Sequence, residues 1–298
     1  MMNRILITGG SGFVGLHLTN LLIAKGYEVC WLTRKINSFV DVTQYLWDWR
    51  EKHIDFSVFK NVDVIINLAG ANLNGRRWDA KLKKEIYESR VRSTAFLFET
   101  ISKHPYQISS FISASAVGYY GNVQTEKTYY ETDPCGDDFL ATTCRDWEQA
   151  ANKFSELNIR TVVLRSGIVL SEHSEAFKKI SLPFRFGLGA SLGSGKQYFP
   201  WIHLQDLLNI YLKAVIDSSF TGAYNAVVPE SLTNKQLAKK LSKHFRKKIW
   251  LPNIPSFYIK LLFGEIADSL LHQSNISSEK ILRTGFKFEY PGIDSFVK

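Results

Sequence analysis

Three glycines near the start of the chain have the spacing of a phosphate-binding loop. The apolar residues 5–7 lead into Gly9, Gly12 and Gly15, and an amphipathic segment follows over 16–23. This order predicts a buried strand, a tight turn and a helix, as a nucleotide-binding βαβ unit requires. Gly9 would allow the turn, Gly12 the approach of a pyrophosphate, and Gly15 close packing of the helix on the sheet. Because N–H groups at a helix N-terminus bind phosphate, we predict a cofactor loop of Gly9, Ser11, Gly12, Phe13 and Val14.

Positive charge follows the next expected strand, where the choice of cofactor is made. Residues 27–32 predict a strand, and Arg34 and Lys35 come directly after its end. An acidic residue here would bind the ribose 2′-hydroxyl of NAD, whereas an arginine accommodates the 2′-phosphate of NADP. We therefore predict NADP(H) as the cofactor, held by Arg34 and Lys35. The alternative is an ordinary solvated basic turn.

Small residues follow a third expected strand. The apolar run over 62–68 leads into Ala69, Gly70 and Ala71. Small side chains let the backbone lie against a cofactor at the carboxyl edge of a parallel sheet, where ligands bind in such folds. The sequence thus predicts cofactor contacts at Leu68, Ala69 and Gly70.

The rest of the chain alternates between expected strands and helices. We predict strands over 44–49, 111–115, 160–164 and 223–227, and helices over 78–104, 139–157 and 206–217. This alternation favours an α/β fold with a doubly wound parallel sheet of the Rossmann type. Beyond 170 the alternation fades. We expect a dinucleotide-binding domain over 1–170, to which 201–228 returns, and a smaller C-terminal substrate domain from 171–200 and 229–298.

Composition limits the classes of protein to consider. The 298 residues are 45% hydrophobic, which suits a sizeable core. No apolar run reaches the roughly 18 residues of a membrane span, and the first strand starts too early for a signal peptide. The three cysteines, Cys30, Cys135 and Cys144, are an odd number without metal-ligand spacing. We therefore expect a cytoplasmic protein without a metal site or a membrane partner.

The net charge of +9 raises the question of an anionic partner. Much of the basic excess lies in two stretches, 76–92 and 235–248. Neither stretch interleaves aromatic residues as a nucleic-acid stacking platform would. We interpret both as solvated helix faces and expect no nucleic acid, but a small-molecule substrate and a possible oligomer.

Taken together, these motifs resemble the extended short-chain dehydrogenase/reductase superfamily, which includes the nucleotide-sugar epimerases. The loop 8–15 is similar to its cofactor loop, Asn67-Leu68-Ala69-Gly70 to its mid-sheet motif, and 113–121 to its serine strand with one extra residue. The phrases at 89–94, 139–141, 146–148, 186–189 and 222–225 occur together in the "epimerase family protein" subgroup. That subgroup ends in a small domain of unknown function, and the resemblance covers nearly the whole chain.

The chain lacks the residue pair on which that superfamily's chemistry depends. Its members place a tyrosine and a lysine on one helix face with Tyr-x-x-x-Lys spacing, so that the ammonium group lowers the phenol pKa. None of the 13 tyrosines here is followed four residues later by lysine. The corresponding positions are Leu140 and Cys144. Leucine has no proton to give, and a thiol supplies no positive charge.

Two interpretations follow from the missing pair. In the first, neighbouring residues replace it: Tyr119 or Tyr120 as the acid, and Ser115, less favourably Ser113, as the group that polarises a carbonyl. The activity would then be oxidoreduction, or epimerisation through a transient keto intermediate. In the second, the protein binds NADPH without turnover, as a redox sensor or scaffold.

Two further residues are candidates for substrate binding. Arg90 stands where the resembling proteins carry an asparagine, and it could hold an anionic group. His203 is the weaker candidate, because a structural histidine beside Asp206 is the more common situation. Cys144 is a poor candidate nucleophile without a neighbour that lowers its pKa.

Overall fold

The structure is a computed structural model that describes residues 4–36, 38, 41–73, 77–122 and 126–297. Arg76, the first residue of one basic stretch, lies outside these ranges. The strands are β1 Arg4–Thr8, β2 Glu28–Thr33, β3 Thr43–Asp48, β4 His53–Ile54, β5 Val62–Asn67, β6 Ser110–Ala116, β7 Thr128–Tyr129, β8 Arg160–Ser166, β9 Ile168–Leu170, β10 Trp201–His203, β11 Gly222–Ala226 and β12 Asn275–Ile276.

Up to β11, single strands or short runs of strands alternate with one or two helices, and beyond β11 three helices follow one another. The α-helices are α1 Phe13–Ala24, α2 Ala80–Glu88, α3 Val91–Ser102, α4 Phe139–Asn152, α5 Glu175–Arg185, α6 Leu204–Ile216, α7 Asn234–His244, α8 Ser256–Phe263, α9 Ile266–Leu271, α10 Glu279–Arg283 and α11 Ile293–Phe296. Short 3₁₀ helices are η1 Phe56–Phe59, η2 Val117–Tyr120 and η3 Lys153–Leu157.

The main sheet is wound in both directions from β1. Among the described residues it has eight strands in the order β11-β8-β6-β5-β1-β2-β3-β4. Every neighbouring pair is parallel except β3 and β4, which are antiparallel. The predicted doubly wound parallel fold is therefore confirmed. The order reverses at β1, between β1 and β5, and folds of this type bind their ligands at the carboxyl ends of the strands at such a reversal.

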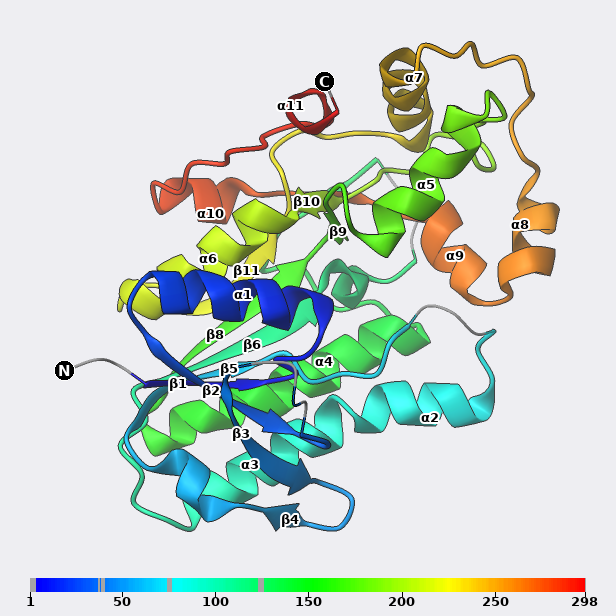
Figure 1. The fold of residues 1–298 in the computed structure, drawn as a ribbon. Coiled ribbons are helices and arrows are strands. Elements are labelled where there is room, and N and C mark those ends of the chain that lie inside the picture. Colours follow the sequence, from blue (N-terminus) through cyan, green and yellow to red (C-terminus); the bar gives the residue numbers. More distant parts are fainter. Residues whose placement is uncertain (1–3, 37, 39–40, 74–76, 123–125, 298) are drawn as a thin grey trace.

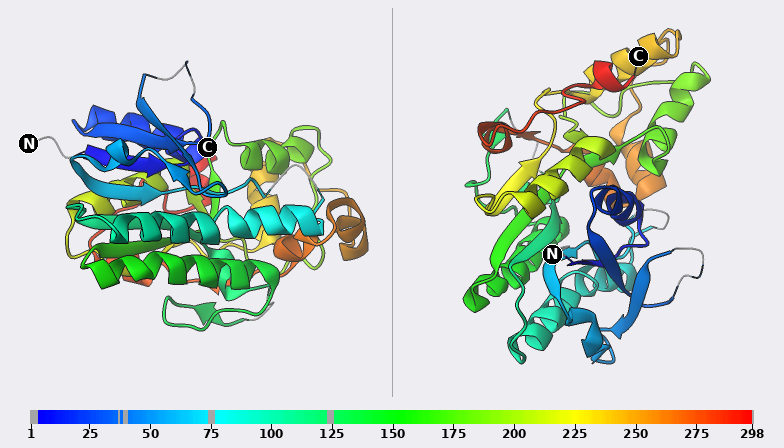
Figure 2. Two further views of the ribbon diagram at one scale, coloured as in Figure 1. Left: turned by 90° about the horizontal axis from the view of Figure 1, so that it is seen from below. Right: turned by 60° about the vertical axis from the view of Figure 1, so that its left-hand side comes forward.

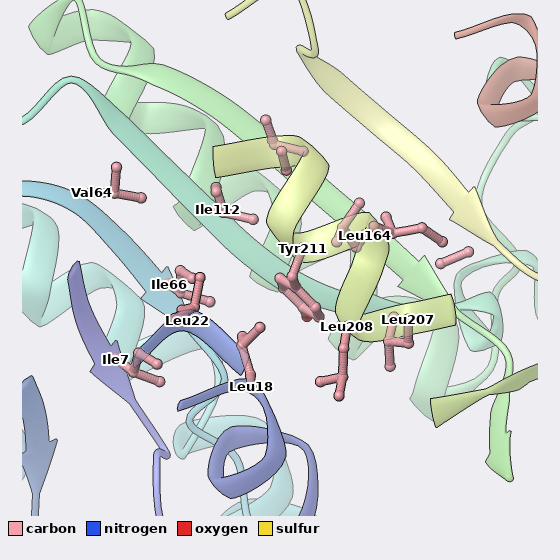
Figure 3. Packing of buried hydrophobic residues seen from close by; sticks show 14 of the residues in the cluster. Ile7, Leu18, Leu22, Val64, Ile66, Ile112, Leu164, Leu207, Leu208 and Tyr211 are labelled. Atoms are coloured by element: carbon pink, nitrogen blue, oxygen red, sulfur yellow. The ribbon is translucent and has the colours of Figure 1, made fainter. Parts of the chain in front are cut away.

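Helices cover both faces of the sheet. Figure 1 shows α1 and α6 on one face and α2, α3 and α4 on the other, and the left view of Figure 2 shows α2 and α3 in line with each other and α4 beside them. In Figure 3, Leu18 and Leu22 of α1 and Leu208 and Tyr211 of α6 pack on side chains of the strands, among them Ile66. These side chains are buried, and each buried Leu or Ile contributes about 1.5–3 kcal/mol to folding.

Two predicted helices differ from those in the structure: one is broken in the middle and the other ends earlier as an α-helix. The helix predicted over 78–104 is two helices, α2 and α3, separated at Ser89 and Arg90. The break has a physical reason, since both residues contact the turn after β5, as described below. The helix predicted over 139–157 ends as an α-helix at Asn152 and continues as η3.

The C-terminal part has a hydrophobic cluster of its own. It joins Phe177 and Phe184 of α5 to Trp201, to Leu241 of α7 and to Ile293. In Figure 1 these elements stand at the upper right of the sheet, together with α8 and α9. Among the described helices, none is long and apolar enough to cross a bilayer.

Candidate functional site

The glycine loop after β1 is shaped by close contacts between backbone segments. Gly9 has a φ of +71°, and a Cβ there would lie 2.7 Å from the carbonyl oxygen of Leu68. A Cβ on Gly15 would lie 2.4 Å from the carbonyl oxygen of Gly9. Gly15 therefore makes room for the loop itself, rather than for the sheet as the sequence interpretation held. Both positions require glycine, and together they fold the loop over the start of α1.

The start of α1 leaves its backbone donors available. Gly12 is the N-cap, and in the described structure no side chain caps the helix and its first turn contains no acidic residue. The first N–H groups of an α-helix have no partner within the helix, so this end attracts an anion. A dinucleotide's pyrophosphate fits this cradle. Gly10 was missed by the sequence analysis: a Cβ there would lie 2.5 Å from the Trp31 ring, so the loop packs directly on β2.

A buried polar network holds the ends of β1 and β5 together. Thr8 Oγ1 donates to Asn67 Oδ1 at 2.7 Å and accepts from the Ala69 N–H at 3.2 Å. Asn67 Nδ2 donates to Thr94 Oγ1 on α3 at 2.9 Å. Thr94 Oγ1 also accepts a hydrogen bond from Trp147 Nε1 on α4 at 3.1 Å. Buried polar groups that satisfy one another fix a unique arrangement. The network positions the predicted cofactor residues Leu68 and Ala69 beside the glycine loop.

The break between α2 and α3 clamps the turn after β5. Ser89 Oγ accepts from the Ala71 N–H at 2.9 Å, and Arg90 donates to the carbonyl oxygens of Ala71 and Ile86, each at 3.1 Å. A Cβ on Gly70 would lie 2.9 Å from Arg90 Cζ. Burial lowers the pKa of Arg90. The guanidinium thus supports the cofactor turn, and we assign it no contact with substrate.

The two basic residues after β2 lie at the same edge of the sheet. Arg34 and Lys35 are exposed, and Thr33 Oγ1 accepts from the Lys35 N–H at 3.4 Å and donates to its carbonyl oxygen at 2.9 Å. This small turn orients the backbone and leaves both cationic side chains in solvent. The position of a 2′-phosphate in a Rossmann fold is next to this turn.

A buried ion pair lies beneath the end of β6. Arg165 on β8 and Glu148 on α4 form two hydrogen bonds, Nε to Oε1 at 2.9 Å and Nη2 to Oε2 at 2.8 Å, with both residues at most 6% exposed. Ser115 Oγ donates to Glu148 Oε1 at 2.6 Å. Burial by itself would lower the pKa of Arg165, but its bonds to the Glu148 carboxylate raise it overall. The single hydroxyl proton of Ser115 is thus used in the hydrogen bond to Glu148. A buried hydroxyl held this way polarises no carbonyl.

The two candidate tyrosines on η2 have different surroundings. Tyr120 is 2% exposed, donates to Asn225 Oδ1 at 2.7 Å and accepts from Arg165 Nη1 at 2.9 Å. Burial raises the pKa of Tyr120 to about 12. Tyr119 is partly exposed, and the Arg165 guanidinium lies 3.4 Å from its ring centre. Burial also raises the pKa of Tyr119, although Arg165 opposes the shift. Tyr119 is the more accessible phenol.

Leu140 and Cys144 pack under η2 at the positions of the missing pair. A Cβ on Gly118 would lie 3.6 Å from Leu140 Cβ and 4.0 Å from Cys144 Sγ. Burial raises the pKa of Cys144 to about 12, so its thiol stays protonated. Both side chains support η2 by packing, and neither transfers a proton at neutral pH.

His203 has the geometry of a structural histidine. It caps α6 by accepting the Gln205 N–H on Nδ1 at 3.2 Å, and its ring stacks on Tyr290 at 3.6 Å between ring centres. Burial lowers its pKa to about 4, so the ring is neutral at physiological pH. Asp206 accepts the N–H groups of Glu289 and Tyr290 and ties the same segment to α6.

A small cavity lies between η2, α4 and the C-terminal part. Its volume is about 30 Å³, and it is lined by Val117, Gly118, Tyr120, Gly121, Asn122, Leu140, Pro200, Ser269, Gln273, Ser274 and Ile276. A larger cavity of about 310 Å³ lies between α5, α7 and residues 296–297, away from the ends of the sheet strands. The smaller cavity lies beside η2, directly after β6, at the end of the sheet where a substrate would meet a cofactor in such a fold, and we call it the proposed substrate side.

The comparisons with known proteins agree with this geometry. The model of the NAD dependent epimerase/dehydratase family matches residues 5–226, and that of a domain of unknown function, DUF1731, matches residues 254–298. This chain belongs to the NAD dependent epimerase/dehydratase family. It is 35% identical to human epimerase family protein SDR39U1 over 99% of this chain and 98% of the relative. It is 32% identical to the Bacillus subtilis epimerase family protein YfhF over 98% and 95%. The predicted resemblance to this subgroup is confirmed.

Solved structures of family members share the fold. The crystal structure of human SDR39U1 with NADPH has a TM-score of 0.86 and 33% identity, covering 99% of this chain and 98% of that one. UDP-glucose 4-epimerase from Thermotoga maritima, solved with UDP-glucose, has a TM-score of 0.76 at 18% identity, covering 99% and 96%. The second likeness concerns the fold alone.

Proposed function

We propose that this family member is an NADP(H)-dependent oxidoreductase that acts on a small carbonyl or hydroxyl substrate. The observation that carries the proposal is the edge of the sheet at β1, β2 and β5. There, in the described part of the chain, a helix N-terminus without a side-chain cap, close-packed glycines and two exposed cations lie at the same edge of the sheet. The NADPH in the crystal structure of human SDR39U1 supports the same cofactor here.

The cofactor would be held by the residues predicted from the sequence. The loop from Gly9 to Val14 receives the pyrophosphate, Arg34 and Lys35 the 2′-phosphate, and residues 68–70 the ribose and nicotinamide side. NADPH, when bound, supplies the hydride that reduces a carbonyl carbon. Cytoplasmic location and the division into domains at 170, 200 and 228 remain part of this proposal.

Tyr119 is the group we assign to proton transfer. When a carbonyl is reduced, its oxygen becomes an alkoxide, which is far more basic than a phenolate. Tyr119 donates its phenolic proton to that oxygen and regains one from water. A raised pKa keeps the phenol protonated, which favours reduction over oxidation near neutral pH. Glu148, which accepts a hydrogen bond from Ser115, holds Arg165 over the Tyr119 ring, so Ser115 and Glu148 act as positioning residues.

Replacement of Tyr119 tests this assignment. NADPH oxidation is followed by fluorescence with a panel of small ketones and aldehydes. We expect Tyr119→Phe to lower kcat about 100-fold or more, with NADPH affinity unchanged, since general acids contribute about 10²–10⁴-fold. The wild-type rate should be flat between about pH 6 and 9, because the phenol stays neutral. Tyr130→Phe, at an exposed tyrosine, is the matched control. Full activity of Tyr119→Phe would show that another group supplies the proton.

A second candidate function is a non-catalytic NADPH sensor. It is favoured by the hydrogen bonds that occupy Ser115 and Tyr120, and by Leu140 and Cys144 at the positions of the catalytic pair. A sensor would bind NADPH tightly, turn over no substrate of the panel, and bind a partner in one redox state only. Calorimetry with NADPH and NADH comes first, because both candidates fail if neither coenzyme binds.

A further inference from the structure

Helix α8 in the C-terminal part presents apolar side chains to solvent. Of the residues of α8 whose burial is described, only Ile259 is buried, in a cluster with Leu271 of α9. Phe257, Leu261 and Leu262 of the same helix are 64%, 68% and 73% exposed. A surface helix normally presents polar or charged residues to water. Neighbouring apolar side chains that are exposed in this way mark a site of interaction.

Two neighbouring segments extend the apolar surface of α8. Trp250 Nε1 donates to the Gly187 carbonyl oxygen at 2.8 Å, and the Ile254 N–H donates to the Ser191 carbonyl oxygen at 2.8 Å. Residues 250–254 therefore run alongside the loop after α5, and α8 begins directly beyond them. Figure 1 shows the chain from α7 to α8 at the right-hand edge of the molecule. We define the α8 surface as a set of side chains that are each more than half exposed: Phe186, Leu188, Trp250, Phe257, Leu261 and Leu262.

Positive charge adjoins the α8 surface. The run Arg-Lys-Lys over 246–248 is exposed and comes two residues before Trp250, and the sequence has no acidic residue between 246 and 262. The sequence predicts 235–248 as a solvated helix face. In the structure α7 ends at His244, so 246–248 belong to the loop that leads into the α8 surface. An occupant of this surface should therefore be both apolar and anionic.

An anionic lipid bilayer suits this combination better than a second copy of the chain. Aromatic and leucine side chains are stable at the boundary between headgroups and acyl chains, and lysines and arginines beside them bind anionic headgroups. A symmetric second copy would bring its own 246–248 to the same surface. Like charges that face one another oppose association.

We propose that the α8 surface docks this protein on an anionic lipid bilayer, with Trp250, Leu261 and Leu262 at the headgroup boundary and residues 246–248 against the headgroups. The sequence predicts no membrane partner, because no apolar run has the length of a span. Docking in the plane of the bilayer needs no span. The proposal is independent of the oxidoreductase activity, since none of these residues belongs to the loops after β1, β2 and β5 or lines the cavity beside η2.

Co-sedimentation of the full chain with lipid vesicles tests the docking. The vesicles contain phosphatidylcholine alone or phosphatidylcholine with about one-third phosphatidylserine, at about 0.1 M salt. We expect binding to the phosphatidylserine vesicles, weaker binding to phosphatidylcholine alone, and a decrease as salt rises to about 1 M, because salt screens the charges. No binding to phosphatidylserine vesicles, or equal binding to both kinds, overturns the proposal.

A leucine variant tests the apolar contact. Leu261→Gln with Leu262→Gln removes two apolar side chains, and we expect binding to phosphatidylserine vesicles to fall at least about tenfold. The matched control is Phe56→Gln with Ile216→Gln, at side chains that are 52% and 65% exposed on other elements, and it should bind as the wild type does. Full binding of the leucine variant, or an equal loss in the control, would mean adsorption by general charge and overturns the proposal.

A charge variant tests the headgroup contact. Glutamine at all three positions of 246–248 should weaken binding to phosphatidylserine vesicles on the order of 100-fold. The control has glutamine at three exposed lysines that precede β2, β5 and β6, at the other edge of the sheet: Lys25, Lys60 and Lys103. An equal loss in this control overturns the proposal.

Sedimentation velocity without lipid identifies the alternative occupant. A wild-type dimer that becomes a monomer in the leucine variant would assign the α8 surface to a second copy, which also overturns the proposal. Because every substituted side chain is exposed, we expect all variants to melt within a few degrees of the wild type.

Discussion

The cofactor edge and the proposed substrate side of this protein differ in whether their polar groups are hydrogen-bonded within the protein. At the cofactor edge, no side chain of the described residues caps the N-terminus of α1, and Arg34 and Lys35 are exposed to solvent. Beneath the end of β6, Ser115, Glu148 and Arg165 form hydrogen bonds with one another and are buried. A serine, glutamate or arginine of the kind found in active sites thus has a structural role where its polar atoms already bond to other protein groups. The exposed cations and the backbone N–H groups at the start of α1 are the better candidates for binding.

The largest effect we expect is on stability, from the buried ion pair. Glu148→Gln removes the carboxylate and leaves the Arg165 charge buried without a counter-ion, which costs about 3–5 kcal/mol in such pairs. Urea unfolding measures the loss. If Glu148 has a structural role and lies outside the cofactor edge, the NADPH affinity of the folded variant stays within a factor of about two.

A double variant checks the cause. Replacing Arg165 by Met as well removes the uncompensated charge, so Glu148→Gln with Arg165→Met should be less destabilised than Glu148→Gln alone. An equal or greater loss in the double variant would attribute the effect to packing. A loss of NADPH binding without a loss of stability would contradict the structural role of Glu148, because it would place Glu148 in the cofactor site.

His203 gives an intermediate effect with a defined pH dependence. Burial lowers its pKa from 6.5 to about 4, so the unfolded chain binds more protons between those values. The stability contribution is therefore full above pH 6.5 and is lost as pH falls toward 4, by on the order of 1–3 kcal/mol. His203→Asn keeps an N-cap acceptor and should lack this slope. Parallel slopes for both proteins between about pH 4 and 7 would refute the structural role.

The cofactor edge could be predicted because its signals are local. Gly9, Gly12 and Gly15 lie within seven residues, and the apolar runs of β1 and β5 are recognised by their length and by the small residues that follow. A strand–turn–helix unit and its place in a doubly wound sheet follow from such patterns without long-range information.

The substrate side could not be predicted in the same way. Glu148 and Arg165 are 17 residues apart on a helix and a strand, and no local pattern selects which buried carboxylate an arginine meets. Ser115 has the type and position of a catalytic serine, yet only the fold shows that its proton is donated to Glu148. Ser269 and Gln273 lie where the βα alternation has faded, so nothing in the sequence connects them to Gly118.

The smallest effect we expect is on cofactor affinity, from replacing Arg34 at the cofactor edge. Arg34→Ala removes an exposed cation at the surface, so stability should change by less than about 0.5 kcal/mol. Its guanidinium would bind the 2′-phosphate in solvent-screened surroundings, so we expect the Kd for NADPH to rise about tenfold while that for NADH stays the same. Lys248→Ala, which removes an exposed cation from the loop after α7, is the matched control for net charge. Equal changes for NADPH and NADH, or an equal effect of Lys248→Ala, would mean that Arg34 attracts the cofactor only through general charge, and the basic turn would then not select NADP(H).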